Sequence, residues 1–265
     1  MIRPALCALA AVPLLSSPAQ AEDAFALFAA QSGPEARPPA HVPYRHTVEV
    51  TVSGSKGDTV HDPLTARLRI DPSRPAGERV TVLERGAEAR GEMEKALREM
   101  IEEIEDPERT PAAQAQSFWC NAGGEPPTPA DFAVVEDTDT HIALRPSAER
   151  MVSMFMQTGD RELDRKERSM AKKLSDRLEG HIVYGKPSGL IRSAHFNITR
   201  PMTVLMVAKI RQMKMDQTCS LAPNGHPYVS EFSMDVRVTA LGSKISNVME
   251  LTVGDLEWIG DAPAG

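Results

Sequence analysis

Cysteine is the residue type most open to chemistry in this chain, and its three copies do not share one role. Cys7 lies in an apolar segment that precedes a cleavage-like pattern at 19–21. Removal of that segment leaves Cys120 and Cys219, and in an oxidising compartment an isolated pair forms one disulfide. Neither has a second Cys or His at metal-ligand spacing. We therefore predict a structural Cys120–Cys219 bridge and no metal site.

Methionine is the second residue type with ligand chemistry. Met151, Met154 and Met156 place three thioethers within six residues, and Met213 and Met215 add two more. Thioethers are soft ligands that suit Cu(I), so a Met-rich copper binder is one hypothesis. Apolar residues interleave with the first cluster and no histidine adjoins it, which favours a core segment. Methionine also fills flexible cores and lines adaptable apolar surfaces, and spacing alone does not separate these two uses.

Serine and histidine form no hydrolase motif. Ser53 with Lys56, and Ser169 with Lys172, match S-x-x-K, but neither pair is followed by S-D-N or K-T-G. The chain also lacks G-x-S-x-G and H-E-x-x-H. His46 falls on the apolar side of a predicted strand, which favours a structural histidine. We predict no enzymatic activity and no cofactor.

The first 21 residues have the three-part pattern of a secretory signal peptide. Arg3 gives a positive start, residues 5–15 are apolar, and Ala19-Gln20-Ala21 matches the A-x-A cleavage pattern. The apolar stretch is shorter than the roughly 20 residues needed to span a bilayer. We expect cleavage before Glu22, a periplasmic location, and no transmembrane segment in the mature chain.

The composition is that of an ordinary globular protein, with 41% hydrophobic and 25% charged residues. The formal net charge of −7 argues against a basic surface that binds nucleic acid. Residues 22–265 are long for one domain but within the range of β-barrels and sandwiches. We predict a single domain with Pro-rich inserts near 31–43 and 107–130.

Most of the chain after residue 43 alternates with period two, the pattern of half-buried antiparallel strands. A bulge near Arg211 and Gln212 would keep the apolar residues of one long strand, or two, on one face. Residues 53–58 are predicted as a turn, and Asn224-Gly225 as a hairpin cue. The predicted strands are 44–52, 64–70, 81–84, 132–136, 141–144, 182–184, 190–198, 203–219, 228–239 and 245–253.

Helical spacing occurs chiefly at 87–105, where an apolar stripe runs between charged residues, and more briefly at 24–31. Few helices among many strands indicate an α+β chain that is mainly antiparallel β. We predict a curved, unclosed β-barrel covered by one or two helices.

The order of elements resembles the LolA/LolB-type lipoprotein-carrier superfamily. The resemblance is carried by LEGHIVYGKPSGLIRS from Leu178, TVLMVAKIRQMKM from Thr203, and YVSEFSMDVRVTALGSKISNVMELTVGDLEWI from Tyr228. It implies an unclosed β-barrel that wraps over a helical lid and holds acyl chains.

On this basis we expect a secreted periplasmic protein that binds a lipid or other apolar ligand. The alternative is a non-enzymatic scaffold with a filled core that docks on an envelope protein partner. The expected ligand-binding residues on the sheet are Val50, Met206, Ile210, Phe232, Met234, Val236, Met249 and Leu251, and on the covering helix Met93, Leu97 and Met100.

Overall fold

The protein is described from a computed structural model of the 265-residue chain. The structure describes Phe25 and residues 38–86, 91–120, 128–147, 150–151, 173, 176–186, 188–205 and 208–260. The predicted signal peptide at 1–21, and all of the short helix predicted at 24–31 except Phe25, lie outside these residues.

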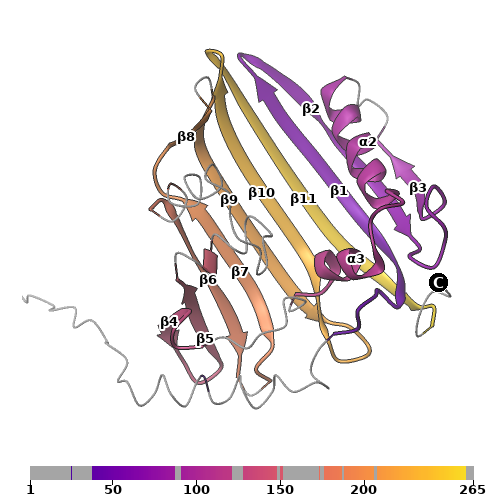
Figure 1. Ribbon diagram of the computed structural model, residues 1–265. Helices are drawn as coiled ribbons and strands as arrows, with labels where there is room; N and C mark the ends of the chain where they lie inside the picture. Colours follow the sequence, from indigo (N-terminus) through magenta and orange to yellow (C-terminus); the bar gives the residue numbers. More distant parts are fainter. Residues whose placement is uncertain are drawn as a thin grey trace, which may run out of the picture.

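One antiparallel sheet of eleven strands dominates the described chain (Figure 1). Its order is β3-β2-β1-β11-β10-β9-β7-β6-β5-β4, and β8 pairs with β9. The strands are β1 (Tyr44–Lys56), β2 (Thr59–Ile70), β3 (Val80–Arg85), β4 (Phe132–Asp137), β5 (His141–Pro146), β6 (Leu178–Gly185), β7 (Ile191–Ile198), β8 (Met202–Leu205), β9 (Ala208–Leu221), β10 (Pro227–Ala240) and β11 (Ser243–Trp258).

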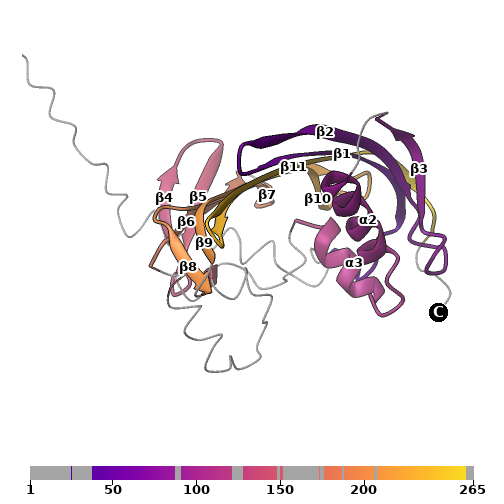
Figure 2. The same ribbon diagram turned by 90° about the horizontal axis from the view of Figure 1, so that it is seen from above.

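The sheet bends into an arch, and the helices α2 (Glu92–Ile104) and α3 (Pro111–Phe118) lie inside it (Figure 2). The two edge strands, β3 and β4, do not pair with each other, so the barrel is unclosed. The predicted fold class, a curved and unclosed antiparallel sheet covered by helices, is therefore confirmed.

Helix α3 was not predicted, because its segment belongs to a proline-rich stretch. Pro111 occupies the first turn, where a missing N–H costs nothing. The Thr110 side chain caps the helix by accepting a bond from the Ala113 N–H at 3.2 Å. The insert expected near 107–130 therefore contains a helix.

Several strand boundaries differ from the expected ones. Residues 53–56, predicted as part of a turn, continue β1, and the chain reverses at Gly57 with φ +63°. Residues 203–219, predicted as one strand or two, form two strands. The predicted bulge is confirmed, because the β9–β10 register shifts between Gln212 and Ile210 and leaves Arg211 unpaired.

Three hydrophobic clusters hold the described chain together. The first lies under β4–β7 and includes Leu144 and Phe196. The second joins β1 and β2 to α2, with Leu68 fully buried. The third is aromatic and joins α3 to the ends of β1 and β10 through Tyr44 and Trp119.

None of the helices among the described residues has both the length and the apolar character needed to cross a bilayer.

Candidate functional site

The side of the sheet that faces the helices carries a continuous row of apolar side chains across six strands. Residues paired directly across antiparallel strands point to the same face. The row follows from the register between neighbouring strands and consists of Phe196 on β7, Met215 on β9, Met234 on β10, Met249 on β11, Val52 on β1 and Leu64 on β2. We call this side the concave face.

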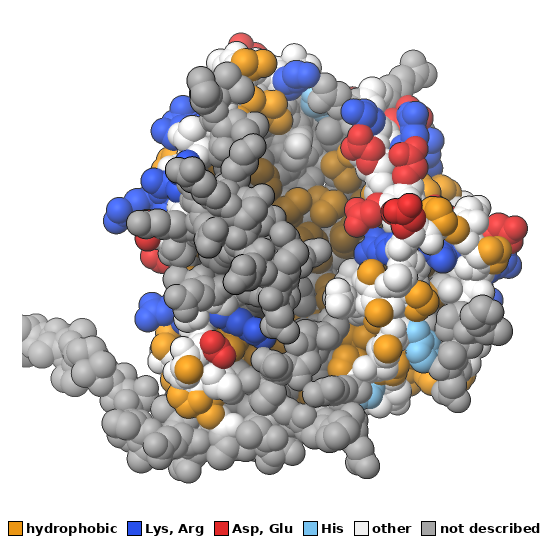
Figure 3. Space-filling view, viewed as in Figure 1, with side chains coloured by type: hydrophobic (Ala, Val, Ile, Leu, Met, Phe, Trp, Pro, Cys, Tyr) orange, Lys and Arg blue, Asp and Glu red, His pale blue; other side chains and the backbone are white. Residues whose placement is uncertain are grey.

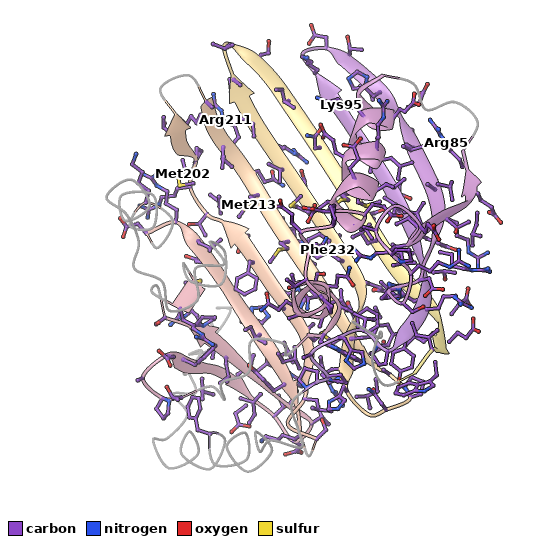
Figure 4. All side chains as sticks on the ribbon, turned by 45° about the vertical axis from the view of Figure 1, so that its right-hand side comes forward. Arg85, Lys95, Met202, Arg211, Met213 and Phe232 are labelled. Atoms are coloured by element: carbon purple, nitrogen blue, oxygen red, sulfur yellow. A yellow bond between two sulfur atoms is a disulfide. The ribbon has the colours of Figure 1, made fainter. Side chains whose placement is uncertain are left out.

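Two neighbouring rows extend the apolar surface along the strands. Phe232 pairs with Leu251, which pairs with Val50, while Val236 pairs with Met213 on the other side of the central row. Figure 4 labels Phe232 and Met213 within this part of the sheet. The alternate residues of the same strands are mostly polar and point to the convex face. The sheet is therefore amphipathic.

The centre of the concave face is partly accessible. The side chains of β9, β10 and β11 in these rows are half-buried, whereas Val50 and Leu64, nearer α2, are 1% exposed. Hydrophobic side chains gather in a hollow beside the helices (Figure 3). An ordinary two-layer core would bury the central rows as completely as the flanks. The described residues thus form an apolar groove.

Most of the predicted ligand-binding residues meet on this face. The structure brings together the sheet residues Val50, Ile210, Phe232, Met234, Val236, Met249 and Leu251. Met206 and the side chain of Met93 lie outside the described residues. Met213, Met215 and Phe196 share the face and were not among the predicted site residues. The bulge at Arg211, which returns both methionines to this face, is the signal that identifies them.

Helix α2, which the sequence predicted to cover the concave face, packs along one side of the groove. Leu97 is buried and, with Met100 and Ile101, packs against apolar residues of β1, β2 and β11. A helix is about 10 Å across and neighbouring strands are about 4.8 Å apart, so one helix spans roughly two strands. In the described chain, Phe232 and Met234 are not part of this packing.

The C-terminal end of α2 is fixed to the sheet by Glu105. Its carboxylate accepts hydrogen bonds from the backbone N–H groups of Gly77 at 2.6 Å, Arg79 at 3.2 Å and Val80 at 2.6 Å. At the other end, Glu94 forms an exposed ion pair with Arg85 at 3.0 Å. An exposed ion pair contributes little, so α2 is held more firmly at its C-terminal end.

Aromatic side chains occupy one end of the concave face. The Phe118 ring stacks on Tyr228, with ring centroids 5.6 Å apart. It also packs edge-to-face with Trp119, with ring centroids 4.7 Å apart. His46 packs on Phe118 at 5.0 Å, and its Nδ1 lies 3.1 Å from the Tyr44 carbonyl oxygen. Burial lowers the pKa of His46 to about 4, so the ring is neutral near pH 7. This histidine has a structural role.

The predicted disulfide is present beside this aromatic end. Cys120 lies two residues after the end of α3 and is bonded to Cys219 on β9. The Gln217 amide nitrogen lies 3.5 Å from the Cys120 sulfur and 3.7 Å from the Cys219 sulfur. Sulfur is a weak hydrogen-bond acceptor. The side-chain nitrogen of Gln217, on the concave face, therefore forms only weak hydrogen bonds to these two sulfur atoms.

A serine, a histidine and an aspartate are in contact on the convex face. His195 Nδ1 lies 2.8 Å from Asp216 Oδ1, and its Nε2 lies 3.1 Å from Ser193 Oγ. Asp216 also pairs with Lys214 at 2.7 Å. Ser193 lies on a strand that is paired on both sides, so the hydrogen bonds of the sheet occupy the backbone N–H groups of this part of β7. The contacts therefore form a surface hydrogen-bond network.

Among the described residues, no group of three or more His, Cys, Asp or Glu is placed to hold a metal ion. Of the methionines in the first predicted copper cluster, Met151 is buried in the cluster that includes Phe196, and Met154 and Met156 lie outside the described residues. Met213 and Met215 also pack against that cluster.

No family model matches the chain, and no curated protein does. Among solved structures, the chain is similar to a LolA superfamily protein from Nitrosomonas europaea. The identity is 11%, the match covers 89% of this chain and 93% of that chain, and the TM-score is 0.28. At this identity and TM-score the match carries no conclusion about the fold, a ligand or a partner of this chain.

Proposed function

We propose that the protein binds the hydrocarbon part of a lipid, or a similar apolar ligand, in the groove of its concave face. The observation that carries this proposal is the apolar row across six strands, whose central members Met215, Met234 and Met249 are half-buried. Flexible thioether side chains adapt to ligands of variable shape.

The expected affinity follows from the hydrophobic effect. Each buried CH₂ group contributes about 0.8 kcal/mol, so ten inserted carbons contribute about 8 kcal/mol before ordering costs. That amount corresponds to binding in the micromolar range. The proposed setting is the periplasm, supported by the signal-peptide pattern and by a disulfide, which is typical of oxidising compartments.

Uptake of a fluorescent fatty acid tests the proposal. We expect the wild-type protein to bind the probe with a micromolar Kd, and Met234→Asp to weaken binding at least tenfold, because it places a charge on the groove floor. Ser246→Asp is the matched control. Ser246 lies on the convex face opposite Arg237, which would pair with the new carboxylate.

Each variant is checked by circular dichroism, and Met234→Gln, which keeps the side-chain length, replaces Met234→Asp if the latter unfolds. Absence of probe uptake by the folded wild-type protein would exclude the carrier proposal and favour the scaffold alternative.

A further inference from the structure

We infer that one rim of the sheet docks on an anionic lipid bilayer. The rim consists of residues 56–62 at the β1–β2 turn, 238–245 at the β10–β11 turn, and 208–211 at the start of β9. It lies at the end of the strands opposite the aromatic cluster, at the top of Figure 1. The Gly57 N–H donates to the Lys244 carbonyl oxygen at 2.8 Å, which holds the two turns side by side.

The two most exposed large hydrophobic side chains of the described chain both lie on this rim. Leu241 is 81% exposed and Val60 is 80% exposed. A single exposed apolar residue is ordinary on a protein surface. Here Val60 lies at the start of β2, paired with Ser55, and Leu241 lies in the neighbouring β10–β11 turn, so both are at the same end of the sheet.

Leu241 is also conformationally unfavourable at its position. Leu241 and Gly242 have φ values of +49° and +82° in the turn between Ala240 and Ser243, which pair with each other. Two positive φ values define a type I′ hairpin turn, in which Asn or Gly is favoured at the first central position. A leucine there stabilises neither the turn nor a core. The chain thus holds a strained, exposed leucine at the tip, the kind of outlier that suggests function.

The rim is basic, although the chain as a whole carries a net charge of −7. Lys244 and Lys209 both lie across from Thr239, and Arg211 Nε donates to the Thr239 hydroxyl at 3.1 Å. None of these three cations forms an ion pair with another described residue. With Lys56, the rim has four basic residues against the two acidic ones, Asp58 and Asp62.

Basic side chains around a projecting apolar pair match the chemistry of an anionic membrane surface. Lys and Arg are attracted to negative headgroups, and apolar tips enter the boundary between headgroups and acyl chains. This inference does not depend on the groove, because it uses different residues and a different surface.

Co-flotation with vesicles tests the inference. We expect the purified chain to float with vesicles of phosphatidylcholine containing 30% phosphatidylglycerol. Binding should weaken several-fold at high salt and be several-fold lower on pure phosphatidylcholine. Leu241→Asn should reduce vesicle binding at least fivefold while leaving the unfolding midpoint unchanged or higher, because Asn tolerates positive φ. That combination separates docking from folding.

Val60→Thr, which keeps the side-chain shape, should also weaken flotation. Leu221→Asn is the matched control, because Leu221 is 63% exposed at the other end of β9. Equal flotation of wild type and Leu241→Asn, or no flotation of the wild-type chain on anionic vesicles, would overturn the inference. An equal loss of vesicle binding in Leu221→Asn would overturn it as well, because membrane binding would then not depend on the rim.

Discussion

Cys120 and Cys219 are joined by a disulfide that links the end of α3 to β9, with Cα atoms 6.3 Å apart and a sequence separation of 99 residues. The bridge fixes the segment after α3 to β9 at the aromatic end of the concave face. It closes a long loop, and long loops lose the most chain entropy when they are cross-linked.

Replacing both cysteines by serine should therefore lower the free energy of unfolding by about 4–5 kcal/mol on the chain-entropy model. Urea unfolding of the double variant and the wild type measures this difference. A reducing agent should destabilise the wild type by a similar amount and leave the variant unaffected. Two titratable thiols in unfolded, never-reduced wild-type protein would contradict the bridge.

His46 should make stability depend on pH in a narrow window. Burial lowers its folded-state pKa to about 4, while the unfolded value is about 6.5. The unfolded state thus binds a proton more readily. The contribution of the neutral His46 ring to the free energy of unfolding is fully present above pH 6.5 and is lost as pH falls towards 4. The total loss is up to about 3 kcal/mol.

His46→Gln cannot titrate, so its stability should be flatter than that of the wild type between pH 6.5 and 4. The aspartates with lowered pKa values, such as Asp71 and Asp216, lose their stabilising effect only at lower pH. Parallel pH profiles of the two proteins in urea titrations would show that His46 does not carry the effect.

Glu105 should anchor α2 against the sheet. Glu105→Ala removes three charge-assisted hydrogen bonds to the backbone of residues 77–80 and should destabilise the protein by about 2–3 kcal/mol. Hydrogen exchange of the α2 amides should accelerate in this variant. Glu102→Ala, an exposed change on the same helix, is the control and should cost less than about 0.5 kcal/mol.

Signal processing is a separate expectation. Export to the periplasm should remove residues 1–21, so N-terminal sequencing of protein from the envelope fraction should begin at Glu22. Changing Ala21 to a bulky residue should block cleavage and leave a longer chain. Protein from that fraction that still begins with Met1 would show that the pattern is not a cleavage site.

Local sequence pattern was enough to predict which segments form strands and which face of each strand is apolar. Alternation identified the face that Met234 and Met249 share, and the parity change identified the bulge at Arg211. The apolar face and the bulge both depend on the order of residues along the chain, so the sequence alone is enough to predict them. Alternation does not specify a partner strand, so the pairing of β1 with β11 near the other end of the chain was not predicted.

Other features were missed because they depend on three-dimensional context. Helix α3 has eight residues and lies among prolines, although Thr110 followed by Pro111 is a helix-start signal. The predicted strand at 64–70 was too short, because a bulge accommodates Asp62 and Pro63 within β2, which starts at Thr59. The accessibility of the groove depends on sheet curvature, which alternation does not encode.

Photo-crosslinking shows where on the protein an acyl chain binds. A fatty acid carrying a diazirine in its tail is bound to the protein, activated by light, and located by mass spectrometry of the peptides. We expect adducts on the concave-face residues of β9, β10 and β11, such as Met215, Met234 and Met249, and competition by unlabelled fatty acid. Adducts confined to convex-face residues, or labelling that excess fatty acid does not reduce, would contradict binding in the groove.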